Sequence, residues 1–225
     1  MLVWLASYPR SGNTLLRILM NRCFGVETLS LYDDQFGDAR DDVFAKVVAH
    51  RKHGLSQQEI RAQAAADPKQ VYLKTHGLPD DKSKAIYVIR DGRASVVSYW
   101  HYLREVEKAD VSLEDVVAGR VWAGSWSNHV AHWALTWRPD TLVLRYENLC
   151  GAPERATAQI ADFLGLPAPA AAKVDFAELQ AAMPQFFRRG ANSANLSELQ
   201  GAELDLFWQL HGDIMGDFSY GPAPQ

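Results

Sequence analysis

The sequence predicts an α/β protein in which helices cover both faces of a mostly parallel sheet. Four short apolar runs lack the alternation of half-exposed strands and have the length of strands buried on both faces. Segments with helical periodicity separate these runs, and strands that alternate with helices form parallel sheets. With 48% hydrophobic and 22% charged residues, the 225-residue chain has enough apolar material for such a core, which excludes a disordered or fibrous protein.

The expected strands are Leu2–Tyr8, Val71–Thr75, Ala85–Arg90 and Leu142–Tyr146. The expected helices are Asn13–Phe24, Ser56–Ala65, Ala94–Arg104, Leu113–Arg120, Ser125–Trp137, Pro153–Leu164 and Ser197–Leu210. We expect residues 1–225 to form a single domain, because no repeat, low-complexity tract or linker divides them. Residues 27–70 are polar and are expected to form an insertion or lid, with a solvated face as the alternative for their aspartates.

Charge and cysteine content narrow the class of partner. The net charge of −4, from 23 Lys+Arg against 27 Asp+Glu, disfavours a nucleic-acid binder, so a bound anion must meet a local cluster of cations. Cys23 and Cys150 show no metal-ligand pairing, which is typical of a reducing compartment. The sequence shows no signal peptide and no apolar run of about 18 residues, so we expect a cytoplasmic protein that binds no membrane.

The strongest pattern is a strand that runs into SYPRSGNT and then into an amphipathic helix. Gly12 permits tight backbone geometry, and the first amides of the helix would face an anion bound at the turn. Arg10 supplies a cation, while Ser11 and Thr14 supply hydroxyl donors. The segment lacks the first Gly and the Lys of GxxxxGK[ST], so we expect a phosphate loop of another kind. The alternative is a structural turn with a solvent-facing Arg10.

A second pattern, VYLKTHGLP, ends a strand with Lys74 and His76. Side chains two residues apart on a strand point the same way, so both are expected at the carboxyl edge where parallel sheets bind ligands. Lys74 offers a cation for a leaving group, and His76 offers a base that titrates near neutral pH. The alternative for His76 is a purely structural histidine.

Two further segments carry arginines. Arg90 ends a strand, Asp91 is the expected N-cap of the next helix, and Ser98 follows about two turns later. Arg90 and Ser98 are therefore placed to meet one phosphate from two elements. In FFRRG, Arg188 and Arg189 precede a Gly and suit bidentate phosphate binding, unless they form a solvated surface pair.

Aromatic residues at near-helical spacing form a stripe that consists of Trp122, Trp126, Trp133 and Trp137. We interpret the stripe as core, with the alternative that part of it lines a ligand pocket. His129 and His132 lie within it and are interpreted as packing residues rather than metal ligands. Trp100, His101 and Tyr102 are the expected pocket wall.

In order and over nearly the whole chain, these segments resemble the sulfotransferases that use 3'-phosphoadenosine 5'-phosphosulfate (PAPS), particularly the cytosolic type. SYPRSGNT is similar to the TYPKSGTTW loop for the 5'-phosphosulfate, and KTHGLP to the KTHLP segment with the base and its supporting Lys. YVIRDGRASVVSYWH resembles the segment that binds the 3'-phosphate. LVLRYENL is similar to the strand ending in YEDL, whose Tyr contacts the adenine, and FFRRG to the RKG segment that closes over the 3'-phosphate.

The resemblance implies a P-loop-NTPase-like three-layer fold and assigns roles to residues. The catalytic roles fall on His76, Lys74 and Arg10. Donor binding falls on Arg10, Ser11, Gly12, Asn13, Thr14, Arg90, Ser98, Tyr146, Arg188, Arg189 and Gly190. The implied reaction is in-line transfer of a sulfuryl group from PAPS to a hydroxyl or amine of a small-molecule acceptor. His76 is the implied base, 3'-phosphoadenosine 5'-phosphate (PAP) is the product, and no metal is needed.

The chain also departs from the family pattern. Arg10 stands in place of a Lys, Leu15 replaces a common Trp near the adenine, and ANSANLSEL stands where GDWK often follows RKG. Ser98 has two candidate roles, which are to bind the 3'-phosphate or to restrain Lys74.

Two other function classes stay open. A nucleotide or small-molecule kinase is disfavoured by the missing GxxxxGK[ST] and by the absence of a clear magnesium-binding Asp at a strand end. A non-catalytic nucleotide-binding protein is disfavoured by the presence of both Lys74 and His76. The identity of the acceptor and the oligomeric state do not follow from the sequence.

Overall fold

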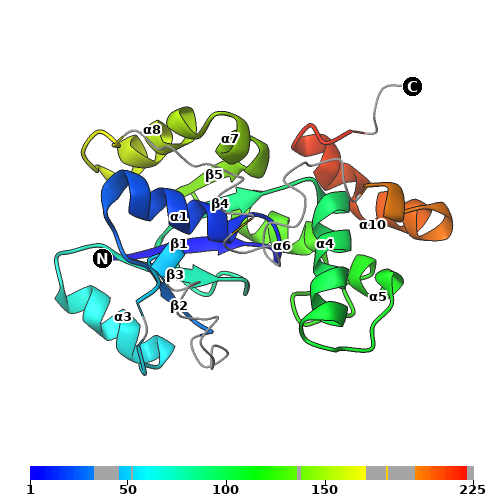
Figure 1. The fold of residues 1–225 in the computed structure, drawn as a ribbon, viewed down its shortest axis with the longest axis horizontal. Coiled ribbons are helices and arrows are strands. Elements are labelled where there is room, and N and C mark those ends of the chain that lie inside the picture. Colours follow the sequence, from blue (N-terminus) through cyan, green and yellow to red (C-terminus); the bar gives the residue numbers. More distant parts are fainter. Residues whose placement is uncertain (33–45, 52, 136–137, 171–180, 182–195, 222–225) are drawn as a thin grey trace.

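The computed structural model describes residues 1–32, 46–51, 53–135, 138–170, 181 and 196–221. Its centre is a five-stranded sheet in the order β2-β3-β1-β4-β5, in which every pair of neighbours is parallel (Figure 1). The strands are β1 (Leu2–Ser7), β2 (Leu29–Ser30), β3 (Val71–Thr75), β4 (Lys84–Ile89) and β5 (Thr141–Arg145). This arrangement confirms the predicted parallel α/β sheet.

The four predicted strands are present with ends shifted by one residue at most. Arg90 and Tyr146 lie just beyond β4 and β5 instead of inside them, and Tyr146 begins the helix α7 (Tyr146–Gly151), which was not predicted. The two-residue strand β2 was not predicted either. It pairs with β3, so part of the segment expected as an insertion belongs to the edge of the sheet.

The helices follow the predicted segments closely at most positions. They are α1 (Asn13–Phe24), α3 (Gln57–Ala66), α4 (Gly92–Glu105), α5 (Leu113–Val117), α6 (Trp126–Val130), α8 (Pro153–Leu164) and α10 (Gly201–Asp217). The predicted helix Ser125–Trp137 is divided, because α6 passes into the π-helical turn η2 (Ala131–Leu135). The helix α5 stops before the predicted Arg120, because Gly119 adopts a left-handed conformation with φ of 72°.

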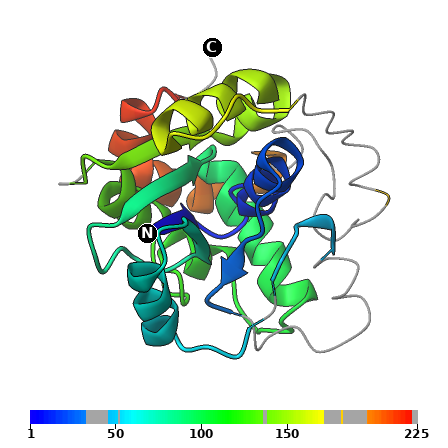
Figure 2. The same ribbon diagram turned by 90° about the vertical axis from the view of Figure 1, so that its left-hand side faces the viewer.

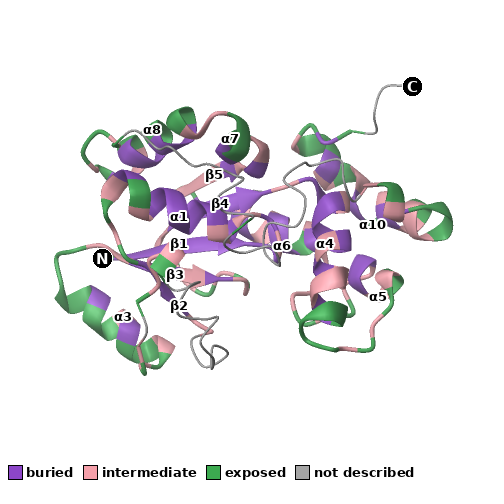
Figure 3. Cartoon of the chain, viewed as in Figure 1, coloured by how far each residue is buried: buried purple, intermediate pink, exposed green. Residues whose placement is uncertain are grey.

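Helices cover both faces of the sheet, which gives the expected three layers (Figure 2). Alternate residues of β1 point to opposite sides. Trp4 and Ala6 belong to the core shared with α3, α4, α5, α6 and α10, whereas Val3 and Leu5 pack with α1, α7 and α8. All six residues of β1 are buried, as the purple strand in Figure 3 shows. The central strand therefore has no solvent-facing side, and its continuous apolar run follows from this position.

The parallel direction of the strands brings the segments after β1, β3, β4 and β5 to one edge. Register then fixes their neighbours: Ala6 lies opposite Thr75, and Ile89 lies opposite Arg145. The residues that follow these pairs, Ser7 beside His76 and Arg90 beside Tyr146, are therefore neighbours at the carboxyl edge. Within the described part of the chain, no helix is both long and apolar enough to span a membrane.

Candidate active site

The segment between β1 and α1 forms a compact loop with exposed backbone donors. The Ser11 N–H donates to the Tyr8 carbonyl at 3.2 Å, and Arg10 holds a left-handed conformation with φ of 63°. Gly12 follows with φ of 107° and is the N-cap of α1, where it has no side chain to cap the helix. The first amides of α1 are therefore available to an anion, as the sequence predicts.

Close packing explains why residue 12 is a glycine. A Cβ atom at Gly12 would lie 2.5 Å from Cδ2 of Tyr146, and the positive φ would strain any other residue. Tyr146 is only 8% exposed, and the guanidinium of Arg90 lies over its ring, 4.6 Å from the centroid. Tyr146 thus forms the floor beneath both the loop and the Arg90 guanidinium.

Arginine side chains from two segments meet at this loop. Arg90 Nη1 donates to the Arg10 carbonyl at 3.1 Å, and Arg10 Nε donates to Ser98 Oγ at 3.3 Å. The guanidinium of Arg10 also lies over the Tyr102 ring, 5.5 Å from its centroid. Arg90 Nε is buried, and no acceptor contacts it within the described residues. A buried guanidinium N–H without an acceptor is costly, and a bound phosphate oxygen would satisfy it.

The Ser98 hydroxyl accepts from Arg10, and no hydrogen bond joins it to Lys74 within the described residues. Ser11 and Asn13 use their side chains to brace the loop. Ser11 Oγ contacts Ser95 Oγ at 3.1 Å, and Asn13 Nδ2 donates to the Leu5 carbonyl at 2.9 Å. The backbone N–H groups that remain for an anion are those at the N-terminus of α1, and Thr14 is half-buried at the first turn of this helix.

His76 is held in a single tautomer. Its Nδ1–H donates to the Ser7 carbonyl at 2.8 Å, because a carbonyl only accepts. The Nε2 atom is therefore left with its lone pair, which is the arrangement a general base needs. Burial, and next to it the charge of Lys74, holds the pKa of His76 well below its ordinary value. The imidazole is therefore neutral at physiological pH.

Lys74 lies at the same edge and is largely desolvated. Burial, followed by repulsion from Arg17 and Arg10, lowers the pKa of Lys74 to about 7. Its Nζ lies 5.1 Å from the centroid of the Tyr32 ring. The Lys74 ammonium is thus poised between its charged and neutral forms near neutral pH.

Tyr32 is a site residue that the sequence analysis missed. Its ring stacks on the His76 imidazole at 5.9 Å with an interplanar angle of 11°, and its hydroxyl accepts the His76 backbone N–H at 2.9 Å. Tyr32 follows β2 within the segment expected as an insertion. The signal that could have found it is the run Thr28-Leu-Ser-Leu before Tyr32, a short strand that ends in an aromatic residue.

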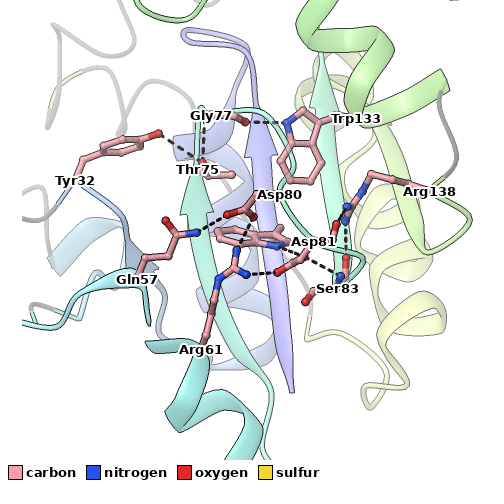
Figure 4. Close-up of polar contacts among 11 residues, drawn as sticks. Tyr32, Gln57, Arg61, Thr75, Gly77, Asp80, Asp81, Ser83, Trp133 and Arg138 are labelled. Carbon is pink, nitrogen blue, oxygen red and sulfur yellow. Dashed lines mark hydrogen bonds and ion pairs between the residues drawn. The ribbon is translucent and has the colours of Figure 1, made fainter. Parts of the chain in front are cut away.

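A cavity of about 670 Å³ opens beside His76 and is lined by its two neighbours, Thr75 and Gly77. Tyr32, Trp122 and Trp133 supply aromatic walls, and Figure 4 shows Tyr32 and Trp133 on either side of Thr75 and Gly77. Trp133 is fixed by a hydrogen bond of 2.9 Å from its Nε1 to the Gly77 carbonyl, whereas Trp122 is 66% exposed at 5.6 Å from the Tyr32 ring.

The cavity also has a polar side. Asp80 lines it and accepts from Gln57 Nε2 at 2.9 Å and from Arg61, as Figure 4 shows. The cavity therefore combines aromatic and aliphatic walls with polar groups that could orient a ligand.

The expected pocket wall is corrected by these positions. Trp100 Nε1 donates to the Val111 carbonyl at 3.1 Å, and His101 pairs with Glu105 and Glu198. Neither lines the cavity, and Tyr102 instead faces Arg10. These side chains are engaged by local partners, so part of the tryptophan stripe forms the wall. Trp126 is core, as predicted, and Trp137 lies outside the described residues.

The predicted FFRRG segment, with Arg188, Arg189 and Gly190, lies outside the described residues. Around the described edge, no cluster of three or more His, Cys, Asp or Glu side chains is placed to hold a metal ion. Asp91 is engaged within the fold, since its carboxylate accepts the Arg93 backbone N–H at 2.9 Å and pairs with the Arg93 guanidinium at 2.7 Å.

Comparison with known proteins identifies the relatives of this chain. The model of the sulfotransferase domain family matches residues 2–185. A flavonol 3-sulfotransferase of Flaveria bidentis is 27% identical over 180 residues, which are 73% of this chain and 57% of the relative. Sulfotransferase 1A1 of Canis lupus familiaris is 35% identical over 186 residues, which are 73% of this chain and 59% of the relative. The chain thus spans less than two thirds of the length of these relatives.

Solved structures show the same fold. A mouse sulfotransferase, SULT7A1, crystallised with PAP, aligns with a TM-score of 0.66 over 98% of this chain and 86% of its own, at 19% identity. A retinol dehydratase in complex with androsterone and PAP aligns with a TM-score of 0.63 over 96% of this chain and 81% of its own, at 18% identity. Both alignments extend over the sheet and the helices on its two faces.

We expect the Lys74 ammonium to titrate near neutral pH, with a midpoint of about 7, because it is buried beside other cations. NMR of reductively ¹³C-methylated protein measures this midpoint, and loss of the signal in Lys74→Arg identifies it. Arg10→Gln should raise the midpoint, because Arg10 is one of the repelling charges. A midpoint near the ordinary lysine value of about 10.4 would show that the site is better solvated than its geometry indicates.

Proposed function

The chain belongs to the sulfotransferase domain family, and from this premise we propose that it transfers a sulfuryl group from PAPS to a hydroxyl or amine of a small-molecule acceptor. One observation carries the proposal. The loop before α1, the cations Lys74 and Arg90 beside it, and His76 with its free Nε2 all lie at one edge of the sheet. The loop and the cations suit the binding of an anion, and the histidine suits the removal of a proton from the acceptor. We also propose that residues 1–225 act as one sulfotransferase domain.

The residues at the edge fit a donor with two separate anionic groups. We assign the 5'-phosphosulfate to the backbone N–H groups at residues 12–14, where α1 begins, and to Arg10. We assign the 3'-phosphate to Arg90, whose buried Nε has no acceptor among the described residues, with Ser98 nearby. Arg188, Arg189 and Gly190 are proposed to close over the same phosphate on the basis of the sequence alone. The Tyr146 ring supports the Arg90 guanidinium. We propose that the remaining edge of the Tyr146 ring contacts the adenine.

The chemical step follows from the free Nε2 of His76. The acceptor oxygen or nitrogen attacks sulfur, the bond from sulfur to the bridging phosphate oxygen breaks, and PAP leaves with the electron pair. His76 Nε2 takes the acceptor proton. Lys74 and Arg10 stabilise the charge that grows on the bridging and terminal oxygens, an electrostatic task that needs no metal from the chain.

The donor would also tune both titrating groups. Its negative charge opposes the repulsion that lowers the pKa of Lys74 and of His76, so a bound donor favours the charged Lys74 and makes His76 a stronger base.

The cavity beside His76 is the proposed acceptor site. Its volume of about 670 Å³ lies within the range of small-molecule pockets, roughly 300–1,000 Å³. We propose no nucleic-acid or membrane partner. A reducing, cytoplasmic location is proposed from the two free cysteines, Cys23 and Cys150.

A kinase remains the rival enzyme, and ligand-induced stabilisation separates the two. We expect PAP to raise the melting temperature, because it carries both groups that the edge is proposed to bind, whereas ATP with magnesium should not. Differential scanning fluorimetry measures both. Stabilisation by ATP with magnesium alone would favour the kinase. Stabilisation by neither nucleotide would leave a protein that uses the fold for another purpose.

His76→Ala should lower transfer by about 10²- to 10⁴-fold, because it removes the general base. Its affinity for PAP should be unchanged, since His76 is not among the residues to which we assign the phosphates. Turnover with radiolabelled PAPS and PAP titration by calorimetry measure the two quantities. Near wild-type turnover in this variant would refute the role of His76.

Arg90→Ala should weaken PAP binding by about 10- to 100-fold, the value of a lost charge-assisted hydrogen bond of 1.5–3 kcal/mol. Arg104→Ala is the matched control, because Arg104 is an exposed arginine that stacks on Trp100. Calorimetric titration of both variants with PAP makes the comparison. Equal affinity in the two would place the 3'-phosphate elsewhere.

A further inference from the structure

We propose that His129 is a positioning residue for the base, acting with Tyr87 through a buried hydrogen-bond circuit that also includes the peptide group between Ser7 and Tyr8. The proposal rests on the proposed function, because it concerns the same His76. It gives a role to a buried histidine that the donor and acceptor assignments do not use. The sequence pattern had indicated packing alone for His129.

The tautomer of His129 follows from its two partners. Its Nε2 lies 3.0 Å from the His76 carbonyl, which only accepts, so Nε2 carries the proton. Its Nδ1 therefore accepts, and the Tyr87 hydroxyl donates to it at 3.0 Å. Burial lowers the pKa of His129 to about 4, so the ring stays neutral and keeps this tautomer at physiological pH.

The circuit ends at the first residues of the phosphate loop, where the Ser7 carbonyl accepts from His76 Nδ1–H at 2.8 Å. From Tyr87 through His129 and His76 to Ser7, each group donates to the next in the same sense. Hydrogen bonds arranged head to tail polarise one another and strengthen the chain.

The direction of the circuit decides which nitrogen of His76 is free. With His129 donating to the His76 carbonyl, the His76 main chain is fixed at the end of β3 and its imidazole presents Nδ1–H to Ser7. Nε2 is then the only ring atom left for an acceptor proton. Because the Ser7–Tyr8 peptide begins the phosphate loop, the circuit also fixes the base relative to the donor loop.

If His129 had a purely structural role, replacing another buried histidine with similar contacts would lower kcat equally. His211 provides this comparison. His211 is equally buried and makes the same kinds of contact, with Nδ1 at 2.8 Å from Ser127 Oγ and Nε2 at 2.9 Å from the Val117 carbonyl. The partners are the Ser127 side chain on α6, the helix that also carries His129, and the Val117 carbonyl on α5, and neither contributes a hydrogen bond to the circuit. His211→Leu therefore removes a comparable pair of buried hydrogen bonds and leaves those of the circuit in place.

The kinetic test compares His129→Leu with His211→Leu, using radiolabelled PAPS and 2-naphthol as the probe acceptor. We expect His129→Leu to lower kcat by about 10- to 100-fold, because a base displaced by about 1 Å costs this much, while PAP affinity is unchanged. His211→Leu should keep the wild-type kcat. His129→Gln should recover most of the loss, since its side-chain N–H can replace the Nε2–H donor. Equal kcat losses in the two leucine variants would overturn the proposal.

A second readout needs no activity. Ring ¹⁵N chemical shifts should show His76 as the Nδ1–H tautomer in the wild type and as a mixture in His129→Leu, with His76→Gln identifying the signal. Tyr87→Phe keeps the shape of the core but removes the donor to Nδ1, so it carries the same test if His129→Leu does not fold. An unchanged His76 tautomer in these variants would refute the circuit. If the wild type has this tautomer but does not sulfate 2-naphthol or bind PAP, the circuit stands and the proposed function fails.

Discussion

Repulsion among cations gathered at the carboxyl edge of the sheet is the constraint on which the rest of the site depends. Three of them come from different strand ends, and each lies over a tyrosine ring: Arg10 over Tyr102, Lys74 over Tyr32 and Arg90 over Tyr146. An aromatic face attracts a cation without neutralising it. The arrangement holds positive charge in place for an anionic ligand while the protein as a whole carries a net charge of −4.

The part of this site that the sequence predicts consists of residues that directly follow short apolar strands. Four strands were recognisable because they are apolar throughout, and the strand ends then brought Arg10, Lys74, His76 and Arg90 to one edge by topology alone. Family resemblance supplied the roles of these residues. The identity of the fold and of its charged residues was therefore accessible before any coordinates.

The missed features depend on contacts between distant segments. Strand β2 has only two residues, too few for a periodic signal, so the run before Tyr32 gave a weak indication and Tyr32 was not assigned to the site. The passage of α6 into the π-helical turn η2 is a change in backbone hydrogen bonding, which the helical periodicity of side chains does not encode. The tautomers of His76 and His129 follow from carbonyl groups on other elements, and no sequence pattern reports these.

The half-charged state of Lys74 has a consequence for selectivity among anions. At pH 7 a pKa of about 7 leaves the Lys74 side chain roughly half protonated, so the empty pocket attracts abundant small ions such as chloride less than its count of basic residues suggests. A polyvalent ligand that reaches Lys74 recruits the missing proton and creates the full charge only on arrival. We therefore expect small monovalent anions to occupy this site less than they would a site with a permanently charged lysine.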